Sequence, residues 1–241
     1  MIALLLADIH ANLAALEAVL ASAGKVDAMW VMGDTVGYGP EPGQVLALLQ
    51  ELGPLVVVVA GNHDRAVATG EGLELFNPYA AEAARLHRSW LSVAERDLLA
   101  SLPLTRQADG FTLCHGSLRD PLWEYVTTAR QAQETLSRSP TPGACNGHTH
   151  VPALFRYDRA AAVRDTATVD HPHPLAGRVL VNPGSVGQPR DGDPRAAYAL
   201  LDTASGTITF RRTSYDVDGT QRRIRERRLP PFLADRLAVG R

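Results

Sequence analysis

Three short apolar runs lie in the first quarter of the chain, and the segments between them have helical patterns. Residues 2–7, 28–32 and 55–60 are continuously apolar, which is typical of strands buried on both faces of a sheet. Residues 12–24 and 41–52 have apolar periodicity, with a capping asparagine or a proline near the start. Three strands joined by two helical crossovers predict a parallel α/β unit.

The second part of the chain has a more mixed pattern. Residues 78–90 and 93–100 predict helices, and residues 104–114 predict a hairpin because Asp109-Gly110 is a strong tight-turn signal. The remaining expected elements are a helix at 128–138, strands at 144–145, 153–157, 178–181, 196–201 and 207–212, a basic helix at 221–228 and an amphipathic end at 232–237.

One stretch of this second part, residues 158–177, is polar and contains prolines, so we interpret it as a surface excursion. The sequence has no internal repeat, low-complexity tract or interdomain linker. Residues 1–241 are therefore expected to form a single domain of the α/β class.

Five short polar segments contain most of the side chains that suit a metal ion. They are Asp8-Ile9-His10, Gly33-Asp34, Gly61-Asn62-His63-Asp64, His115-Gly116 and Gly147-His148-Thr149-His150. Each follows, or nearly follows, a run that predicts a strand, and together they hold five of the eight histidines of the chain. Because open α/β sheets bind ligands at the carboxyl ends of their strands, we expect these segments to meet at one site.

The side chains in these segments are typical ligands of divalent transition metals. Asp8 and His10 lie two positions apart, so in an extended chain they point to the same side, and the same spacing separates the two histidines of the fifth segment. Carboxylate and imidazole suit a borderline metal, whereas the amide oxygen of Asn62 suits a harder ion. The two oxygens of Asp34 could bridge two ions. The predicted ligands are Asp8, His10, Asp34, Asn62, His115, His148 and His150.

Each of these residues also has an ordinary structural interpretation. A lone histidine after a strand is more often structural than a ligand, Asp34 could be a turn residue after glycine, and Asn62 could form an Asx-turn. The hypothesis of a two-metal site therefore depends on the concurrence of all five segments. Outside them, we interpret His87 as a surface or packing residue of a helix, and His171 and His173 as loop residues.

Composition narrows the classes of function and location. The net charge of −2 gives no global attraction to nucleic acid or to an anionic membrane, so neither is an expected partner. Cys114 and Cys145 lie in apolar runs without a CxxC spacing, which favours buried free thiols in a reducing cytosol. No run reaches the roughly 18 apolar residues of a membrane span, and residues 1–7 lack the basic start of a signal peptide. We therefore expect a cytoplasmic protein, and its oligomeric state stays open.

The order DxH, GD, GNHD, H and GHxH resembles the calcineurin-like metallophosphoesterases. It is most similar to the small bacterial and archaeal members related to diadenosine tetraphosphatases, which residues 8–13, 33–40 and 182–190 also resemble. The resemblance extends over nearly the whole chain, and five motifs in this order are highly specific. It implies two mixed β-sheets packed as a sandwich with helices outside, a four-layer αββα fold.

The resemblance also implies a role for each motif residue. The ligands of the first metal would be Asp8, His10 and His150, those of the second Asn62, His115 and His148, and the bridge Asp34. His63 is similar to the residue that contacts a phosphoryl oxygen or protonates the leaving group, and Asp64 to its orienting partner. Two divalent ions are implied, with manganese expected first and iron, zinc, nickel or cobalt as alternatives.

One departure from the family bears on the substrate. Protein serine/threonine phosphatases carry Asp-Arg-Gly after the GD motif, whereas Thr35-Val36-Gly37-Tyr38-Gly39 stands here, so a phosphoprotein substrate is not expected. The candidate substrate contacts are Asn12, Tyr38, Arg65 and Arg190. The Tyr38 ring could stack on a base or pack on the protein. The glycine-rich residues 182–190 could offer backbone N–H groups to a phosphate or form a tight turn.

These observations predict a metal-dependent phosphoesterase that hydrolyses phosphodiesters or phosphomonoesters. A hydroxide bridging two ions about 3.5–4 Å apart would attack phosphorus in line, without a phosphoenzyme. A hydrolase of dinucleoside polyphosphates is the alternative within this class. A protein-binding scaffold is disfavoured because every ligand and the GNHD histidine are present, and a nuclease because Arg222–Arg228 is better explained as a solvated helix face.

Overall fold

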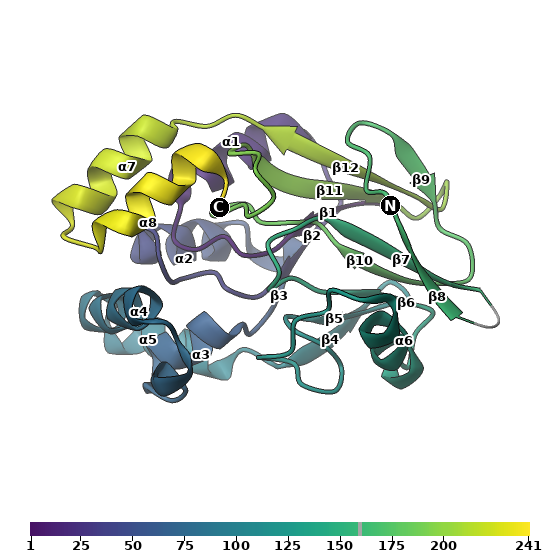
Figure 1. Ribbon diagram of the computed structural model, residues 1–241, viewed down its shortest axis with the longest axis horizontal. Helices are drawn as coiled ribbons and strands as arrows, with labels where there is room; N and C mark the ends of the chain where they lie inside the picture. The colour runs from purple at the N-terminus through teal and green to yellow at the C-terminus, as the bar shows by residue number, and fades with distance from the viewer. Residues whose placement is uncertain (159–160) are drawn as a thin grey trace.

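Two six-stranded β-sheets form the centre of the protein, and helices cover their outer faces (Figure 1). The computed structural model describes residues 1–158 and 161–241. In spatial order, the first sheet contains β3 (Val56–Val59), β2 (Ala28–Met32), β1 (Ile2–Leu6), β11 (Ala196–Asp202), β12 (Thr207–Thr213) and β9 (Pro172–Pro174). The second contains β4 (Thr105–Ala108), β5 (Phe111–Cys114), β6 (Gly143–Cys145), β10 (Arg178–Asn182), β7 (Ala153–Asp158) and β8 (Ala161–Asp165).

The helices lie outside this sandwich and at one end of it (Figure 1). They are α1 (Leu13–Ala23), α2 (Pro42–Glu51), α3 (Asn62–Thr69), α4 (Pro78–Trp90), α5 (Val93–Ser101), α6 (Ala129–Arg138), α7 (Val217–Glu226) and α8 (Pro231–Asp235), with 3₁₀ turns at Gly53–Leu55, Leu73–Leu75 and Arg236–Val239. In Figure 1, α3, α4, α5, α7 and α8 gather at the left, beyond the strands.

The alternation of side chains along β1 explains the layers. Leu5 packs in a cluster that includes Leu113 of the second sheet, whereas Leu4 and Leu6 pack in another cluster with residues of α1 and α2. Successive strand residues point to opposite faces, so a continuously apolar strand fills both the space between the sheets and the space under the helices. On the outer face of the second sheet, Leu136 of α6 packs against β7 and β10. The resulting order of layers is helix, sheet, sheet, helix, as the family resemblance implied.

The parallel strands predicted at the start of the chain are confirmed. β1 pairs in parallel with β2, and β2 with β3, while β5 and β6 form a second parallel pair in the other sheet. The Asp109-Gly110 hairpin is also confirmed, because both residues have positive φ and join antiparallel β4 to β5. Carboxyl ends of parallel strands from both sheets are therefore available to build one site.

Two sequence interpretations are wrong. Residues 158–177 are not only a surface excursion, because β8 pairs with β7 and β9 pairs with β12; residues 159–160 lie outside the described part. Prolines 172 and 174 fit because β9 is an edge strand, which has one side free of ladder hydrogen bonds. A helix that was not predicted, α3, begins within the GNHD motif. Its signals were Asp64 in the first turn and Gly70, with φ of 85°, after the last turn.

Cys114 and Cys145 are free and buried, as predicted. Burial raises the pKa of the Cys114 thiol to about 12. Among the helices in the described part of the chain, none is long and apolar enough to cross a membrane.

Candidate metal centre

The five polar segments meet where parallel strands of both sheets end. Asp8 and His10 follow β1, Asp34 follows β2, and Asn62 opens α3 just after β3. From the other sheet, His115 follows β5 directly, and the GHTH segment follows β6. All seven candidate ligands are buried, with at most 3% of each residue exposed.

The candidate ligands form two groups that share one carboxylate. In each group the donor atoms lie within 4.8 Å of one another, and the groups are Asp8, His10, Asp34 and His150, and Asp34, His115 and His148. Asn62 extends the second group, since its Oδ1 lies 3.1 Å from His115 Nε2. Asp34 Oδ2 lies 3.6 Å from His10 Nε2 and 3.4 Å from His115 Nε2, between the two groups.

Each of the four ligand histidines has one ring nitrogen fixed by a backbone carbonyl. Because a carbonyl only accepts hydrogen bonds, that ring nitrogen must carry the proton, and the other nitrogen turns its lone pair to the centre. The pairs are His10 Nδ1 with Val36 (3.0 Å), His115 Nδ1 with Met32 (2.8 Å), His150 Nδ1 with Gln188 (2.6 Å) and His148 Nε2 with Trp123 (3.2 Å). These contacts fix the tautomers and orient the rings.

The arrangement needs positive charge at its centre. His10 Nε2 and His150 Nε2 face each other at 3.1 Å, and His115 Nε2 faces His148 Nδ1 at 3.0 Å. Among the described residues, Asp34 Oδ2 is buried without a hydrogen-bond donor. Buried acceptors that face one another are costly unless a cation or protons lie between them. The residues present therefore fit divalent cations.

Burial sets the protonation of the centre when no cation is bound. It raises the pKa of Asp8 to about 7 and that of Asp34 well above its ordinary range. Burial also lowers the pKa of His148 to about 2 and holds the pKa values of His10 and His150 well below their ordinary range. A divalent cation reverses this preference for the carboxylates, because a nearby positive charge favours their ionised form.

The backbone of the centre has an uncommon conformation. Ten described residues other than glycine have positive φ, and five of them are candidate ligands: Asp8, His10, Asp34, His148 and His150. Such conformations cost about 1–3 kcal/mol each and concentrate at functional sites. Gly33, which precedes Asp34, also has a positive φ, of 76°. A Cβ at this position would lie 2.9 Å from His115 Nδ1, so both the backbone conformation and the available space require glycine here.

Comparison with known proteins agrees with this geometry. Residues 1–206 match the calcineurin-like phosphoesterase superfamily domain. The chain belongs to this superfamily. It is 41% identical to a metallophosphoesterase from Sphaerobacter thermophilus whose crystal structure superposes with a TM-score of 0.91, covering 100% of this chain and 99% of that one. It is therefore a hydrolase of phosphate esters with a metal-binding site.

Two further relatives are similar to the chain in sequence. The uncharacterized protein MJ0912 of Methanocaldococcus jannaschii is 32% identical over 98% of this phosphoesterase and 97% of its own length. The symmetrical bis(5'-nucleosyl)-tetraphosphatase of Vibrio cholerae is 31% identical over 48% of this chain. The chain spans only 44% of that enzyme's length.

The predicted role of Asp64 as the orienting partner of His63 is not supported by the geometry. Both Asp64 oxygens are occupied elsewhere: they accept hydrogen bonds from the Thr35 N–H and hydroxyl, the Val36 N–H and the Gly61 N–H. Asp64 sits in the first turn of α3, so its carboxylate binds the start of that helix and the GD loop. In this phosphoesterase the His63 ring instead stacks on Phe76, with centroids 4.4 Å apart.

The Tyr38 ring packs on the protein, which decides between the two alternatives left open by the sequence. It is only 6% exposed and lies against His10 and His63, with centroid distances of 4.6 and 4.4 Å. The Arg190 guanidinium lies 5.8 Å from the ring centroid, and its Nη2 donates to the Tyr38 hydroxyl at 3.4 Å. Tyr38 therefore supports two site histidines and Arg190, and although it lines the cavity beside the centre, it leaves little exposed surface for a base.

The other candidate substrate contacts differ in position. Arg190 lines a cavity of about 120 Å³ beside the centre, together with Asp34, Asn62 and His63. Asn12 does not reach this cavity as a free side chain, since it caps α1 through Ala15 N–H and donates to the Gly187 carbonyl. Arg65 on α3 is not among the described residues that line the cavity.

Residues 182–190 form hydrogen bonds within the protein, including bonds to the segment that carries Asp8. The N–H groups of residues 184, 186, 187 and 188 donate to Asn182 Oδ1, the Ala7 and Asp8 carbonyls and Ser185 Oγ. Ser185 Oγ also donates to the Asp8 carbonyl. These N–H groups are already used within the protein, which favours the tight-turn alternative, and within residues 182–190 it is Arg190 that lines the cavity.

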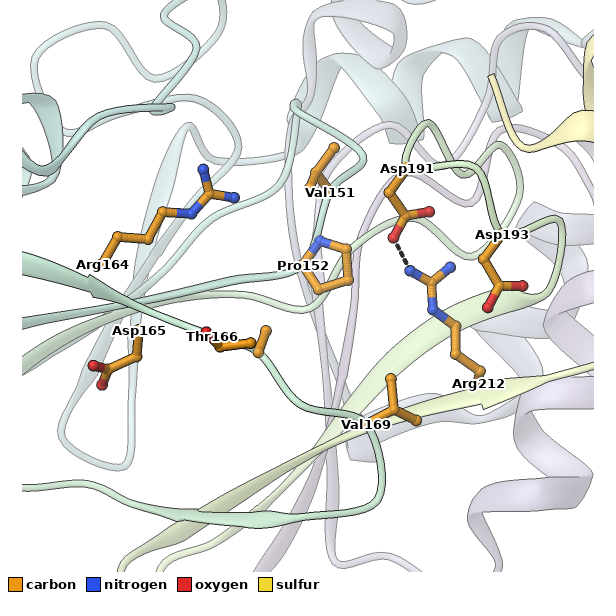
Figure 2. Close-up of a pocket in the computed structure, with 10 residues that line it drawn as sticks. Val151, Pro152, Arg164, Asp165, Thr166, Val169, Asp191, Asp193 and Arg212 are labelled. Atoms are coloured by element: carbon orange, nitrogen blue, oxygen red, sulfur yellow. Dashed lines mark hydrogen bonds and ion pairs between the residues drawn. The ribbon is translucent and has the colours of Figure 1, made fainter.

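A larger cavity of about 440 Å³ lies away from the ligands (Figure 2). Its lining comes from residues 151–152, 164–169, 191–193 and Arg212, and none of the candidate metal ligands contributes. Figure 2 shows the guanidinium of Arg212 paired with Asp191. The smaller cavity is lined by the candidate ligands Asp34, Asn62, His148 and His150, so it is the candidate site.

His87 is a residue of the site that the sequence analysis undervalued. It is fully buried on α4, its Nδ1 accepts from the Gly37 N–H at 3.0 Å, and its Nε2–H donates to the Gly39 carbonyl at 2.8 Å. His87 therefore fixes both neighbours of Tyr38. Burial lowers the pKa of His87 to about 4, which keeps the ring neutral near pH 7 and able to both donate and accept. The sequence signal for its burial was its position seven residues after Ala80, because residues seven apart lie on the same face of a helix.

Proposed function

We propose that this phosphoesterase holds two divalent ions and hydrolyses small phosphodiesters or phosphomonoesters. The observation that carries the proposal is that Asp34 belongs to both ligand groups. A carboxylate with one oxygen directed between two sets of nitrogen and oxygen donors is suited to bridge two ions. The mixed donor set favours manganese, with iron, zinc, nickel or cobalt as alternatives.

Bound ions would supply an ionised water as the nucleophile and would polarise the phosphoryl oxygens. The residues of the chain complete the site around the ester. His63 lines the cavity, so its imidazole is placed to act on a phosphoryl or leaving-group oxygen. Arg190 adds positive charge at the same cavity.

The size of the cavity supports small substrates. A volume of about 120 Å³ accommodates the reacting phosphate group, whereas pockets that enclose whole drug-sized ligands measure roughly 300–1,000 Å³. The remainder of an ester must therefore lie at the mouth. A dinucleoside polyphosphate remains the second candidate, supported by the similarity to the Vibrio cholerae tetraphosphatase over part of its length. The buried free cysteines support our prediction of a reducing, cytoplasmic location.

A substrate panel tests this proposal. Manganese-loaded protein is expected to cleave bis(p-nitrophenyl) phosphate and p-nitrophenyl phosphate, and to act poorly on phosphopeptides because the loop after Asp34 lacks an arginine. The matched control is His171→Gln, an exposed histidine outside the ligand groups, which should retain full activity. Efficient cleavage of phosphopeptides, or no cleavage of any ester after metal loading, would contradict the proposal.

A further inference from the structure

Three aromatic side chains line the cavity without a role in the chemistry described so far. They are Phe76, Trp123 and Tyr125. Phe76 stacks on His63 and contacts Trp123, with centroids 5.3 Å apart. Tyr125 stacks on His148 at 3.8 Å with an interplanar angle of 22°, yet 47% of Tyr125 is exposed. The Tyr125 ring is thus stacked on the His148 imidazole and remains partly exposed to solvent.

The segment that carries Trp123 and Tyr125 is ordered by its own hydrogen bonds. The Gly116 N–H donates to the Pro121 carbonyl at 2.7 Å, and Asp120 Oδ1 accepts from the N–H groups of Leu122 and Trp123. The Asn146 side chain also donates to the Gly116 carbonyl at 2.9 Å. Because these bonds order the segment before a ligand arrives, stacking on Tyr125 would cost little additional conformational entropy.

The position of Trp123 is equally constrained. Its carbonyl accepts from His148 Nε2–H, and its ring lies so close to Gly72 that a Cβ there would be 2.7 Å from the indole. A planar group that enters the mouth therefore meets Tyr125 beside His148, with Trp123 and Phe76 continuing the aromatic lining towards His63.

The cavity itself is too small to enclose both a phosphate and a base. Tyr38 also lines the cavity, but it is packed on His10 and His63 and is only 6% exposed, so it offers little surface for stacking. Among the aromatic residues that line the cavity, Tyr125 is exposed whereas Phe76 and Trp123 are half-buried, so Tyr125 offers the most surface to a planar partner. Aromatic rings stack on nucleobases with little dependence on the base, because every base has a π-face.

We propose that Tyr125 is the stacking surface for the nucleobase of a nucleoside phosphate ester bound at the metal centre. This inference rests on the proposed function, because the phosphate of the same ester occupies the small cavity. It makes Tyr125 a specificity-determining residue: the ring adds binding energy for nucleotide esters and none for esters whose substituents are aliphatic.

The test compares Tyr125→Ala and Tyr125→Phe with the parent protein on two esters. Diadenosine tetraphosphate carries bases, and glycerophosphoethanolamine carries no aromatic group. For Tyr125→Ala, kcat/KM is expected to fall roughly tenfold with diadenosine tetraphosphate and to stay unchanged with glycerophosphoethanolamine, whereas Tyr125→Phe should retain both activities. Tyr79→Ala is the matched control, because Tyr79 is similarly exposed, at 46%, but does not border the cavity.

Two further measurements separate stacking from an effect on the metal centre. Metal content per chain should be equal in all variants, and calorimetric binding of AMP should weaken in Tyr125→Ala only. An equal loss on both esters would overturn the proposal, since it would mean that Tyr125 only orients His148; no loss on either would overturn it as well. If the parent protein cleaves no ester, the proposed function fails, and AMP binding by the parent and Tyr125→Ala still decides whether the ring stacks on a base.

Discussion

Replacing Asp34 with asparagine is expected to remove the bound metal and to lower kcat/KM by more than about 100-fold. Loss of a residue that merely orients a ligand costs about 10–100-fold in metal affinity or activity, so loss of a shared ligand should cost more. The side-chain oxygen of the introduced asparagine can still accept the hydrogen bond that the backbone N–H of His63 donates to Asp34 Oδ1 at 2.9 Å. The change therefore removes the charge and the second oxygen while leaving the loop in place.

Metal content and melting temperature test this expectation together with the kinetics. Burial raises the pKa of Asp34 far above its ordinary value, so the ionised carboxylate destabilises the metal-free fold above the unfolded-state pKa. Metal-free Asp34→Asn should consequently melt no lower than the metal-free parent near pH 7. Asp97→Asn, an exposed position on α5, is the matched control and should behave like the parent. Retention of a full metal complement by Asp34→Asn would contradict the bridging role.

Replacing His63 with glutamine is expected to leave the metal complement intact and to lower kcat by about 10²–10⁴-fold. His63 belongs to neither ligand group, although its side chain lines the same cavity. The result that distinguishes the two roles is metal loss in Asp34→Asn together with metal retention in His63→Gln. If His63→Gln lost its metal while Asp34→Asn kept it, the two roles would be wrongly assigned.

The choice of leaving group separates the two roles that remain open for His63. If His63 protonates the leaving group, the loss in His63→Gln should be larger for an alkyl phosphate than for a p-nitrophenyl ester, which needs no proton to depart. If His63 donates a hydrogen bond to a phosphoryl oxygen, both esters should lose the same factor. The measurement is kcat for both esters, with the His171→Gln variant as the control.

The predicted strands and the candidate ligands were accessible from sequence because both follow from short-range rules. Apolar runs predicted β1, β2 and β3, and parallel strands deliver their carboxyl ends to one edge. The side chains that follow them, such as Asp8 and Asp34, therefore had to lie close together, as the two ligand groups do.

The contacts that refine the site depend on tertiary packing and were not accessible in this way. Asp64 follows His63 in sequence, but the first turn of α3 directs its carboxylate to backbone N–H groups. Tyr125 reaches His148 only because residues 116–124 fold back through their own hydrogen bonds. No spacing or periodicity in that segment distinguishes a cavity-lining ring from an ordinary loop residue.

A metal titration tests the central claim most directly. Protein stripped with a chelator and confirmed as metal-free by elemental analysis would be reconstituted with increasing manganese while bis(p-nitrophenyl) phosphate hydrolysis is followed. We expect no activity without metal, a rise in activity that saturates at two bound ions per chain, and a parallel rise in melting temperature because the ions bind the folded state. Full activity in the metal-free protein would contradict it, as would saturation of activity at a single bound ion.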